Sequence, residues 1–147
     1  MTSHDYTITF RTEQTPETVF EAICNVPAWW SEAFRGNAAR PGDEFEVRFF
    51  GDVHYSRHRL TEAVPGQKIT WLVTDSSLNF VQDKSEWTGT TNSFEIIPSG
   101  SGTELRFTHQ GLTPQLECFK NCNSGWNQYL QSLLQLINTG TGAPYRP

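Results

Sequence analysis

The stretch Gly125-Trp126-Asn127-Gln128-Tyr129-Leu130-Gln131-Ser132-Leu133 decides the fold of this chain. It belongs to a longer run whose apolar residues fall at helical spacing: Phe119, Cys122, Trp126, Tyr129, Leu130, Leu133 and Ile137. This pattern predicts an amphipathic helix from near Thr113 to near Asn138, with one buried face. At ~1.5 Å per residue the helix spans ~35 Å, which is enough to cross a small sheet.

A second helical signature stands near the N-terminus, at Thr15-Pro16-Glu17-Thr18-Val19-Phe20-Glu21-Ala22-Ile23. Thr15 offers an N-cap hydroxyl, Pro16 suits the first helical position, and Glu17 places a negative charge at the positive end of the helix dipole. Pro27 ends this helix before the doublet Trp29-Trp30. The alternation of Tyr6, Ile8 and Phe10 with polar residues predicts a strand ahead of it.

Between the two helical signatures the sequence predicts consecutive antiparallel strands. They are expected at Glu44 to Phe49, Val53 to Val64, Lys68 to Thr74, Trp87 to Ile97 and Thr103 to Gly111, separated by turns rich in Gly and Pro. The segment from Asp75 to Lys84 is expected to be a polar loop, and its Phe80 is expected to cover part of the space under the helix. A long helix laid over one curved sheet encloses a space, and the chemistry of that space is what the protein would use.

Length and composition set broad limits on the protein. With 147 residues the chain is expected to form a single domain over residues 1–147, with residues 143–147 frayed. Aromatic residues make up 13% of it, including five Trp and ten Phe, so large flat side chains must gather in a core or around a cavity.

Charge and hydropathy disfavour several classes of partner. The net charge of −5 opposes binding to nucleic acid. No segment approaches the ~20 apolar residues of a membrane span, and the N-terminus lacks the features of a signal peptide, so we expect a cytoplasmic protein without a membrane partner. The three cysteines, Cys24, Cys118 and Cys122, are expected to be reduced thiols rather than a disulfide or metal pair.

Taken together, these motifs resemble the START-related ligand-binding superfamily, often called SRPBCC. They are similar above all to its branch typified by the C-terminal domain of the activator of heat-shock-protein-90 ATPase. The resemblance rests on the Thr15 to Ile23 opening, the Trp29-Trp30 doublet, the Pro65-Gly66 turn before Trp71, the Thr103-Glu104-Leu105 strand and the Gly125 to Leu130 segment. It implies an α+β helix-grip fold: a curved antiparallel sheet of about six strands around a long C-terminal helix, with two short helices after the first strand. The superfamily serves several functions, so the likeness implies a site and not a reaction.

Strand alternation selects the residues that face the enclosed space. If Leu60 and Phe107 point inward, then His54, Ser56, His58 and His109 share the inner face, and Phe94 inward brings Thr88, Thr90 and Asn92 with it. Apolar walls with a few polar groups describe a small-molecule site. The predicted ligand-binding residues are Trp30, Phe49, His54, His58, Trp71, Phe80, Thr90, Asn92, Phe107, His109, Trp126, Tyr129, Leu130 and Leu133.

Other chemistry has less support in the sequence. His54 and His58 are four apart on a strand, hence separated by ~13 Å, so they cannot share one metal ion. No local signature of a catalytic triad or phosphate-binding loop is present, and no cofactor is expected. Three roles remain open for the inner histidines: satisfied core groups, hydrogen-bond partners of a ligand, or acid/base catalysts. Trp29 and Trp30 are expected to split, one packed under the short helices and the other lining a mouth.

Three functional hypotheses remain open at this point. The first is a domain that binds a small apolar or amphipathic molecule between the sheet and the C-terminal helix, without evident catalysis. The second is a protein-interaction module with a chaperone partner. The third is an acid/base enzyme of the cyclase or dehydratase type. The sequence names neither the ligand nor the oligomeric state.

Overall fold

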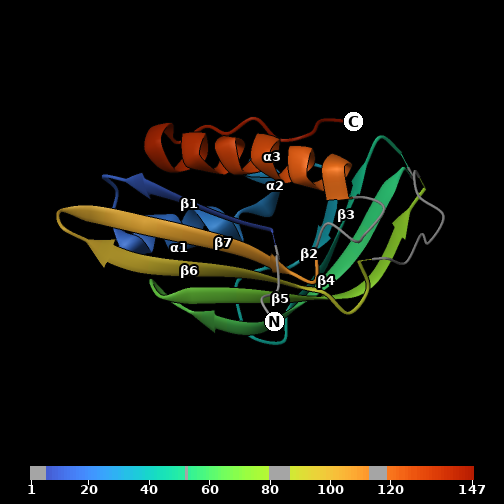
Figure 1. Ribbon diagram of the computed structural model, residues 1–147, viewed down its shortest axis with the longest axis horizontal. Coiled ribbons are helices and arrows are strands. Elements are labelled where there is room, and N and C mark those ends of the chain that lie inside the picture. Colours follow the sequence, from blue (N-terminus) through green and yellow to red (C-terminus); the bar gives the residue numbers. More distant parts are fainter. Residues whose placement is uncertain (1–5, 52, 80–86, 113–118) are drawn as a thin grey trace.

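The structure is a computed structural model that describes residues 6–51, 53–79, 87–112 and 119–147. A curved, seven-stranded antiparallel sheet packs against a long C-terminal helix (Figure 1), which confirms the predicted α+β helix-grip fold. The strands stand in the order β1-β7-β6-β5-β4-β3-β2. The elements in chain order are β1 (Tyr6–Thr12), α1 (Pro16–Cys24), α2 (Val26–Trp29), β2 (Phe34–Gly36), β3 (Glu44–Phe49), β4 (His54–Val64), β5 (Lys68–Leu78), β6 (Thr91–Ser99), β7 (Gly102–Gln110) and α3 (Phe119–Thr139).

Helix α1 begins as its sequence predicts. The Thr15 hydroxyl accepts a hydrogen bond from the Thr18 amide at 3.2 Å, and Pro16 occupies the first turn. Asn25 closes the helix, because its amide bonds the carbonyls of Glu21 and Ala22. Val19, Ala22 and Ile23 are buried, so α1 turns its apolar stripe to the core.

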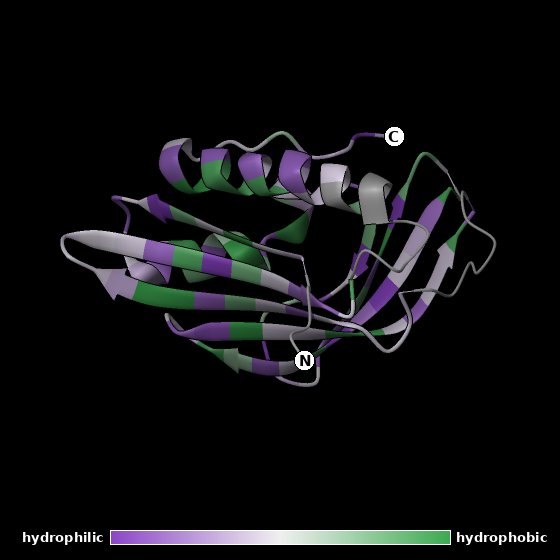
Figure 2. Ribbon diagram, viewed as in Figure 1, coloured by the Kyte–Doolittle hydropathy of each residue, from purple (hydrophilic) through white to green (hydrophobic). Residues whose placement is uncertain are grey.

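Helix α3 lies across the concave face of the sheet, with its apolar side toward the strands (Figure 2). Trp126, Leu130, Leu133 and Ile137 are buried on that side. Each such side chain contributes roughly 1.5–3 kcal/mol of burial free energy, so the apolar stripe accounts for most of the helix's stability. Two side-chain hydrogen bonds also fasten α3 to β1: Tyr6 to Asn127, and Thr12 to Asn138.

Several element boundaries differ from the prediction. The additional strand β2 lies between the Trp doublet and β3, where no strand was predicted; its three residues are too few to show periodicity, and it pairs with β3. Strand β5 continues to Leu78 instead of ending at Thr74, because His54 to Arg57 of β4 pair with it. Strand β6 begins at Thr91, and Trp87 to Thr90 form a turn. Thr88, expected to face inward, is therefore exposed.

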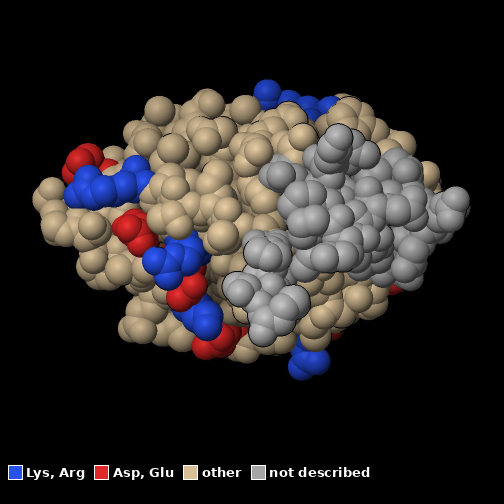
Figure 3. Space-filling model, in the orientation of Figure 1, with Lys and Arg blue, Asp and Glu red and all other residues tan. Residues whose placement is uncertain are grey.

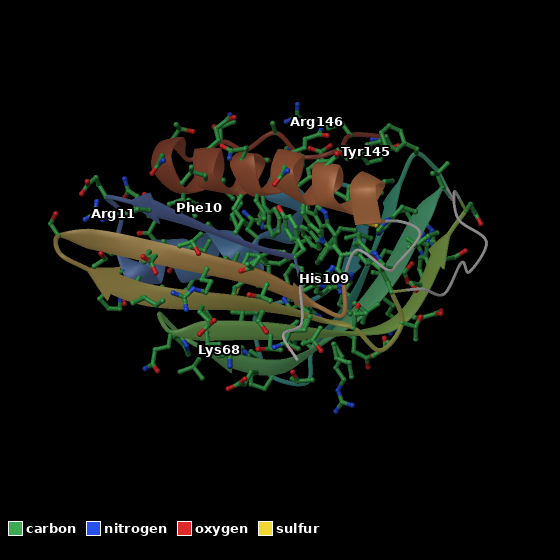
Figure 4. The ribbon with its side chains drawn as sticks, in the orientation of Figure 1. Phe10, Arg11, Lys68, His109, Tyr145 and Arg146 are labelled. Atoms are coloured by element: carbon green, nitrogen blue, oxygen red, sulfur yellow. The ribbon has the colours of Figure 1, made fainter. Side chains whose placement is uncertain are left out.

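The C-terminal tail is held against the body of the protein, where we expected a frayed end. The Tyr145 amide donates to the Trp30 carbonyl and the Tyr145 carbonyl accepts from the Glu32 amide. Arg146 forms an ion pair with Glu32 at 3.1 Å. The tail runs back along α3 toward the edge where Tyr145 lies (Figure 4). It thereby joins the far end of the chain to the segment just after α2.

Gly142 allows the C-terminal tail to pass close to Ala28, so a substitution at this position tests how the tail is held. A Cβ at position 142 would stand 2.3 Å from the Ala28 carbonyl oxygen, so Gly142→Ala must displace the tail. We expect the Tyr145 and Glu32 amides to lose hydrogen-exchange protection in this variant. Thr141→Ala, at an exposed neighbouring position, is the control and should leave both amides protected. Retained protection in Gly142→Ala would show that the tail does not depend on this close approach.

Candidate functional site

A cavity of about 360 Å³ opens between the N-terminal half of α3 and the β3–β4 end of the sheet. Its volume falls within the usual range for small-molecule sites. Its walls are mainly apolar and come from four parts of the chain: Trp30, Phe49, Phe50, Val53, His54, Trp87, Cys122, Ser124, Gly125, Trp126, Gln128 and Tyr129.

The structure divides the predicted site residues into two groups. Trp30, Phe49, His54, Trp126 and Tyr129 line the cavity. A second group lies deeper, in the core between sheet and helices: His58, Trp71, Asn92, Phe107, His109, Leu130 and Leu133, which are buried, and Thr90, which is partly buried. Phe80 lies outside the described residues.

Seven wall residues were missed by sequence reasoning: Phe50, Val53, Trp87, Cys122, Ser124, Gly125 and Gln128. One signal was available for Gly125. A glycine within a helix costs about 1 kcal/mol relative to alanine, and a Cβ here would meet nothing within 4 Å. Since neither backbone conformation nor a close neighbour requires glycine, its effect is to keep the cavity wall open.

All five tryptophans form one aromatic array that runs from the core to the cavity. Trp29 and Trp71 lie deepest, and Trp30 is near-parallel to Trp71 at 5.6 Å and to Trp126 at 5.0 Å between ring centroids. Trp126 is parallel to Trp87 within 5°. Trp29 and Trp30 split as predicted: the Trp29 indole donates to the Ile23 carbonyl in the core, while Trp30 lines the cavity.

Hydrogen bonds around His109 fix the positions of two of these indoles. Trp126 Nε1 donates to His109 Nδ1 at 3.1 Å, so a neutral His109 carries its proton on Nε2 and donates to Thr90 Oγ1 at 2.7 Å. Thr90 in turn donates to the Trp87 carbonyl at 2.6 Å. Trp87 Nε1 donates to Cys122 Sγ at 3.2 Å, which closes a circuit from α3 through β7 and the turn before β6 back to α3. His109 lies inside the fold beneath α3 (Figure 4).

A second chain links the other two histidines. The Ser56 hydroxyl lies 3.1 Å from His54 Nε2 and 2.9 Å from His58 Nε2. Because the hydroxyl has one proton, it can donate to only one of the two rings, so at least one of these histidines carries its proton on Nε2 and donates to the Ser56 oxygen. The chain leads from the cavity wall at His54 to the fully buried His58.

Burial keeps all three histidines neutral. It lowers the pKa of His54 and the pKa of His109 to about 3 each. Burial, and then the neighbouring His54 and His109, lower the pKa of His58 well below its usual value. Such weak bases are poor proton-transfer groups near neutral pH, where a catalytic base works best with a matching pKa. The geometry therefore favours a hydrogen-bonding role.

Phe50 is the unusual residue at the cavity mouth. It is 67% exposed and has a φ of 53°, a conformation that costs a residue with a side chain of order 1–3 kcal/mol. Its ring lies 4.9 Å from the ring of Tyr145 on the tail, and the Tyr145 ring in turn lies 5.5 Å from that of Phe49. An apolar side chain thus projects into solvent beside the opening, at a cost in backbone strain.

Metal and thiol chemistry find little support here. Within the described ranges, no three His, Cys, Asp or Glu side chains are placed to hold a metal ion. Neither Cys24 nor Cys122 is part of a disulfide, and Cys118 lies outside the described residues. Burial, and then Asp43 and Glu21, raise the pKa of Cys24 to about 11, so its thiol stays protonated. The helices that are described include none long and apolar enough to cross a membrane.

The neutral histidines predict a loss of stability in mild acid. Their folded pKa values lie below the unfolded value of about 6.5, so the unfolded chain takes up protons first and stability falls as the pH drops below that point. For three histidines the free energy of unfolding should decrease by about 4 kcal/mol between pH 7.5 and 5.5. Denaturant titrations at the two pH values measure it. His54→Gln should reduce the decrease by about a third, whereas a flat profile would contradict neutral burial.

The His109 tautomer gives a second test. Nitrogen NMR of the imidazole should show His109 protonated at Nε2 alone in the wild type. Trp126→Phe removes the donor to Nδ1. It should lower the free energy of unfolding by about 1–3 kcal/mol, and His109 should lose its preference for the Nε2-protonated tautomer. Tyr129→Phe, on the same helix, is the control and should leave the tautomer unchanged. An Nδ1-protonated wild type would rule out the hydrogen-bond order given above.

Comparisons with known proteins agree with this architecture. The solution structure of the Aha1 dimer from Colwellia psychrerythraea is 23% identical with a TM-score of 0.76, covering 94% of this chain and 98% of that one. Mll3558 from Rhizobium loti is 22% identical with a TM-score of 0.72, covering 92% and 97%. CalU16 from Micromonospora echinospora is 17% identical with a TM-score of 0.64, covering 91% and 76%. At these identities the likeness shows the fold alone.

Comparisons of the sequence identify the family of this chain. No curated protein matches the chain. Residues 13–138, by contrast, match the family described as Activator of Hsp90 ATPase homolog 1-like protein, and this span includes α1, the strands β2 to β7 and nearly all of α3. The chain therefore belongs to the Activator of Hsp90 ATPase homolog 1-like family, a member of the SRPBCC superfamily that the sequence motifs resemble.

Proposed function

We propose that this protein binds a small, neutral, largely apolar molecule in the cavity under α3. The observation that carries the proposal is the cavity itself: about 360 Å³ of space walled by Trp30, Trp87, Trp126 and other apolar groups. Aromatic walls offer large contact areas to flat or hydrocarbon ligands. Gly125, which keeps the wall open at a cost to the helix, supports the same reading.

The electrostatics of the site support a neutral ligand. His54 in the cavity wall is neutral, because burial lowers its pKa to about 3. The cavity walls contain no Lys, Arg, Asp or Glu among the described residues. A ligand charge buried there would lack a partner and would be costly to desolvate. The net charge of −5 further disfavours acidic ligands.

Fluorescence offers a direct test of ligand binding. The neutral probe N-phenyl-1-naphthylamine should bind the wild type, quench the emission of the cavity tryptophans and gain emission of its own. Gly125→Leu places a bulky side chain in the open space and should weaken binding at least tenfold. Gln131→Leu is the matched control, since it puts the same side chain on the exposed face of α3.

The outcomes discriminate clearly. Equal binding by wild type and Gly125→Leu would place the probe elsewhere, and no binding by the wild type to this and other apolar probes would count against a ligand cavity. Gly125→Ala adds a further readout, because alanine should stabilise the helix by up to about 1 kcal/mol while narrowing the cavity.

A second candidate function is a protein-interaction module with a chaperone partner, as the family description suggests. The supporting observation is the strained, exposed Phe50 beside the exposed Val53. Apolar side chains held out in solvent often belong to contact surfaces. In Phe50→Ser, a loss of a measured chaperone interaction much larger than the loss of probe binding would favour this function over the first.

A further inference from the structure

Three side chains in the core present polar atoms that have no protein partner. They are Asn92, with both Oδ1 and Nδ2, Trp71 with Nε1, and His58 with Nδ1. All three residues are fully buried. Folded proteins satisfy nearly all such groups, either with protein atoms or with bound water, so a cluster of this kind indicates a binding site for a polar group.

These atoms belong to neighbouring residues on adjacent strands. Asn92 of β6 stands directly opposite Trp71 of β5. The His58 ring on β4 meets the Trp71 ring edge-on, with 5.4 Å between centroids. Directly opposed residues in a sheet have Cβ atoms about 5 Å apart, so the side chains of Asn92 and Trp71 start side by side on the buried face, and the His58 ring is in contact with that of Trp71.

Apart from His58 and Trp71, the groups described next to Asn92 are already engaged or apolar. On its other side Asn92 faces His109 of β7, whose two ring nitrogens bond Trp126 and Thr90. Phe94, the next inner residue on β6, is apolar and fully buried. The amide therefore needs a partner from outside the protein.

We propose that His58, Trp71 and Asn92 form an inner polar site that binds a neutral hydroxyl oxygen. In the free protein this is a water molecule; in a complex it is the hydroxyl of a ligand. Such an oxygen accepts from the Trp71 indole and donates to the Asn92 carbonyl, which matches the groups present. An ion does not fit, because the buried part of the described chain contains no Lys, Arg, Asp or Glu to balance it.

Trp30 separates the inner polar site from the cavity. Its indole lines the cavity and also lies 5.3 Å from the His58 ring and 5.6 Å from the Trp71 ring. A bound water can exchange with solvent only when Trp30 or the strands move, so its residence time should be long. The inner polar site does not depend on ligand binding in the cavity, and its existence is tested separately from the proposed function.

NMR of the intact protein tests the bound water. In the wild type, the Trp71 indole proton and the Asn92 amide protons should show cross-peaks to a long-lived water. Trp71→Phe should weaken the water contacts at Asn92. Trp29→Phe is the matched control, since that equally buried indole donates to the Ile23 carbonyl and not to the inner polar site.

A pair of ligands distinguishes water from a ligand hydroxyl. Naphthalene and 2-naphthol differ by one hydroxyl group. If 2-naphthol removes the water cross-peaks and naphthalene does not, the oxygen comes from the ligand; if both leave them intact, the site holds water alone. Either result supports the inner polar site. Absence of the cross-peaks in the wild type, both alone and with 2-naphthol at saturation, would overturn it.

Discussion

The site of this protein depends on one closed hydrogen-bond circuit that fastens α3 to the sheet. The circuit runs from Trp126 through His109 and Thr90 to Trp87, and returns to α3 at Cys122. Each side chain of the circuit is held in one orientation because its polar atoms bond its neighbours in the circuit. Two large indoles are consequently held parallel at the cavity edge, where apolar contact alone would leave them free to adopt other rotamers.

The same circuit explains why histidines occupy an aromatic interior. Burial of an imidazole among tryptophans disfavours its charged form, and the neutral ring has one donor and one acceptor with which to order its neighbours. His109 uses both. His54 and His58 share the Ser56 hydroxyl, so a chain of hydrogen bonds connects the cavity wall with the core. A filled, purely apolar core would be more stable but would contain no such ordered polar groups.

Two residues that are unfavourable for their local backbone structure lie in the cavity wall. Gly125 weakens a helix that has room for a larger side chain, and Phe50 holds a strained conformation in solvent. Natural sequences tend to depart from local preference at functional sites. Family membership and the structural likenesses establish the architecture, but fold does not determine function, so the proposal of ligand binding rests on these local features.

Local patterns in the sequence determined much of this protein. The Thr15 cap and Pro16 placed α1, the apolar spacing placed α3, and strand alternation correctly placed Ser56, His58, Asn92 and His109 on the buried face. Periodicity reports which face of an element is apolar, and that information is contained in adjacent residues.

Tertiary structure decided what depends on residues far apart in the chain. Because β5 pairs with β4, it continues through polar residues whose sequence is typical of a loop. The turn before β6 directs Trp87 inward, where it joins the hydrogen-bond circuit. The return of the tail depends on the space between Gly142 and Ala28. The partners of His109 and the cavity walls are likewise set by contacts between distant segments, because packing complementarity and hydrogen-bond geometry exist only once those segments meet.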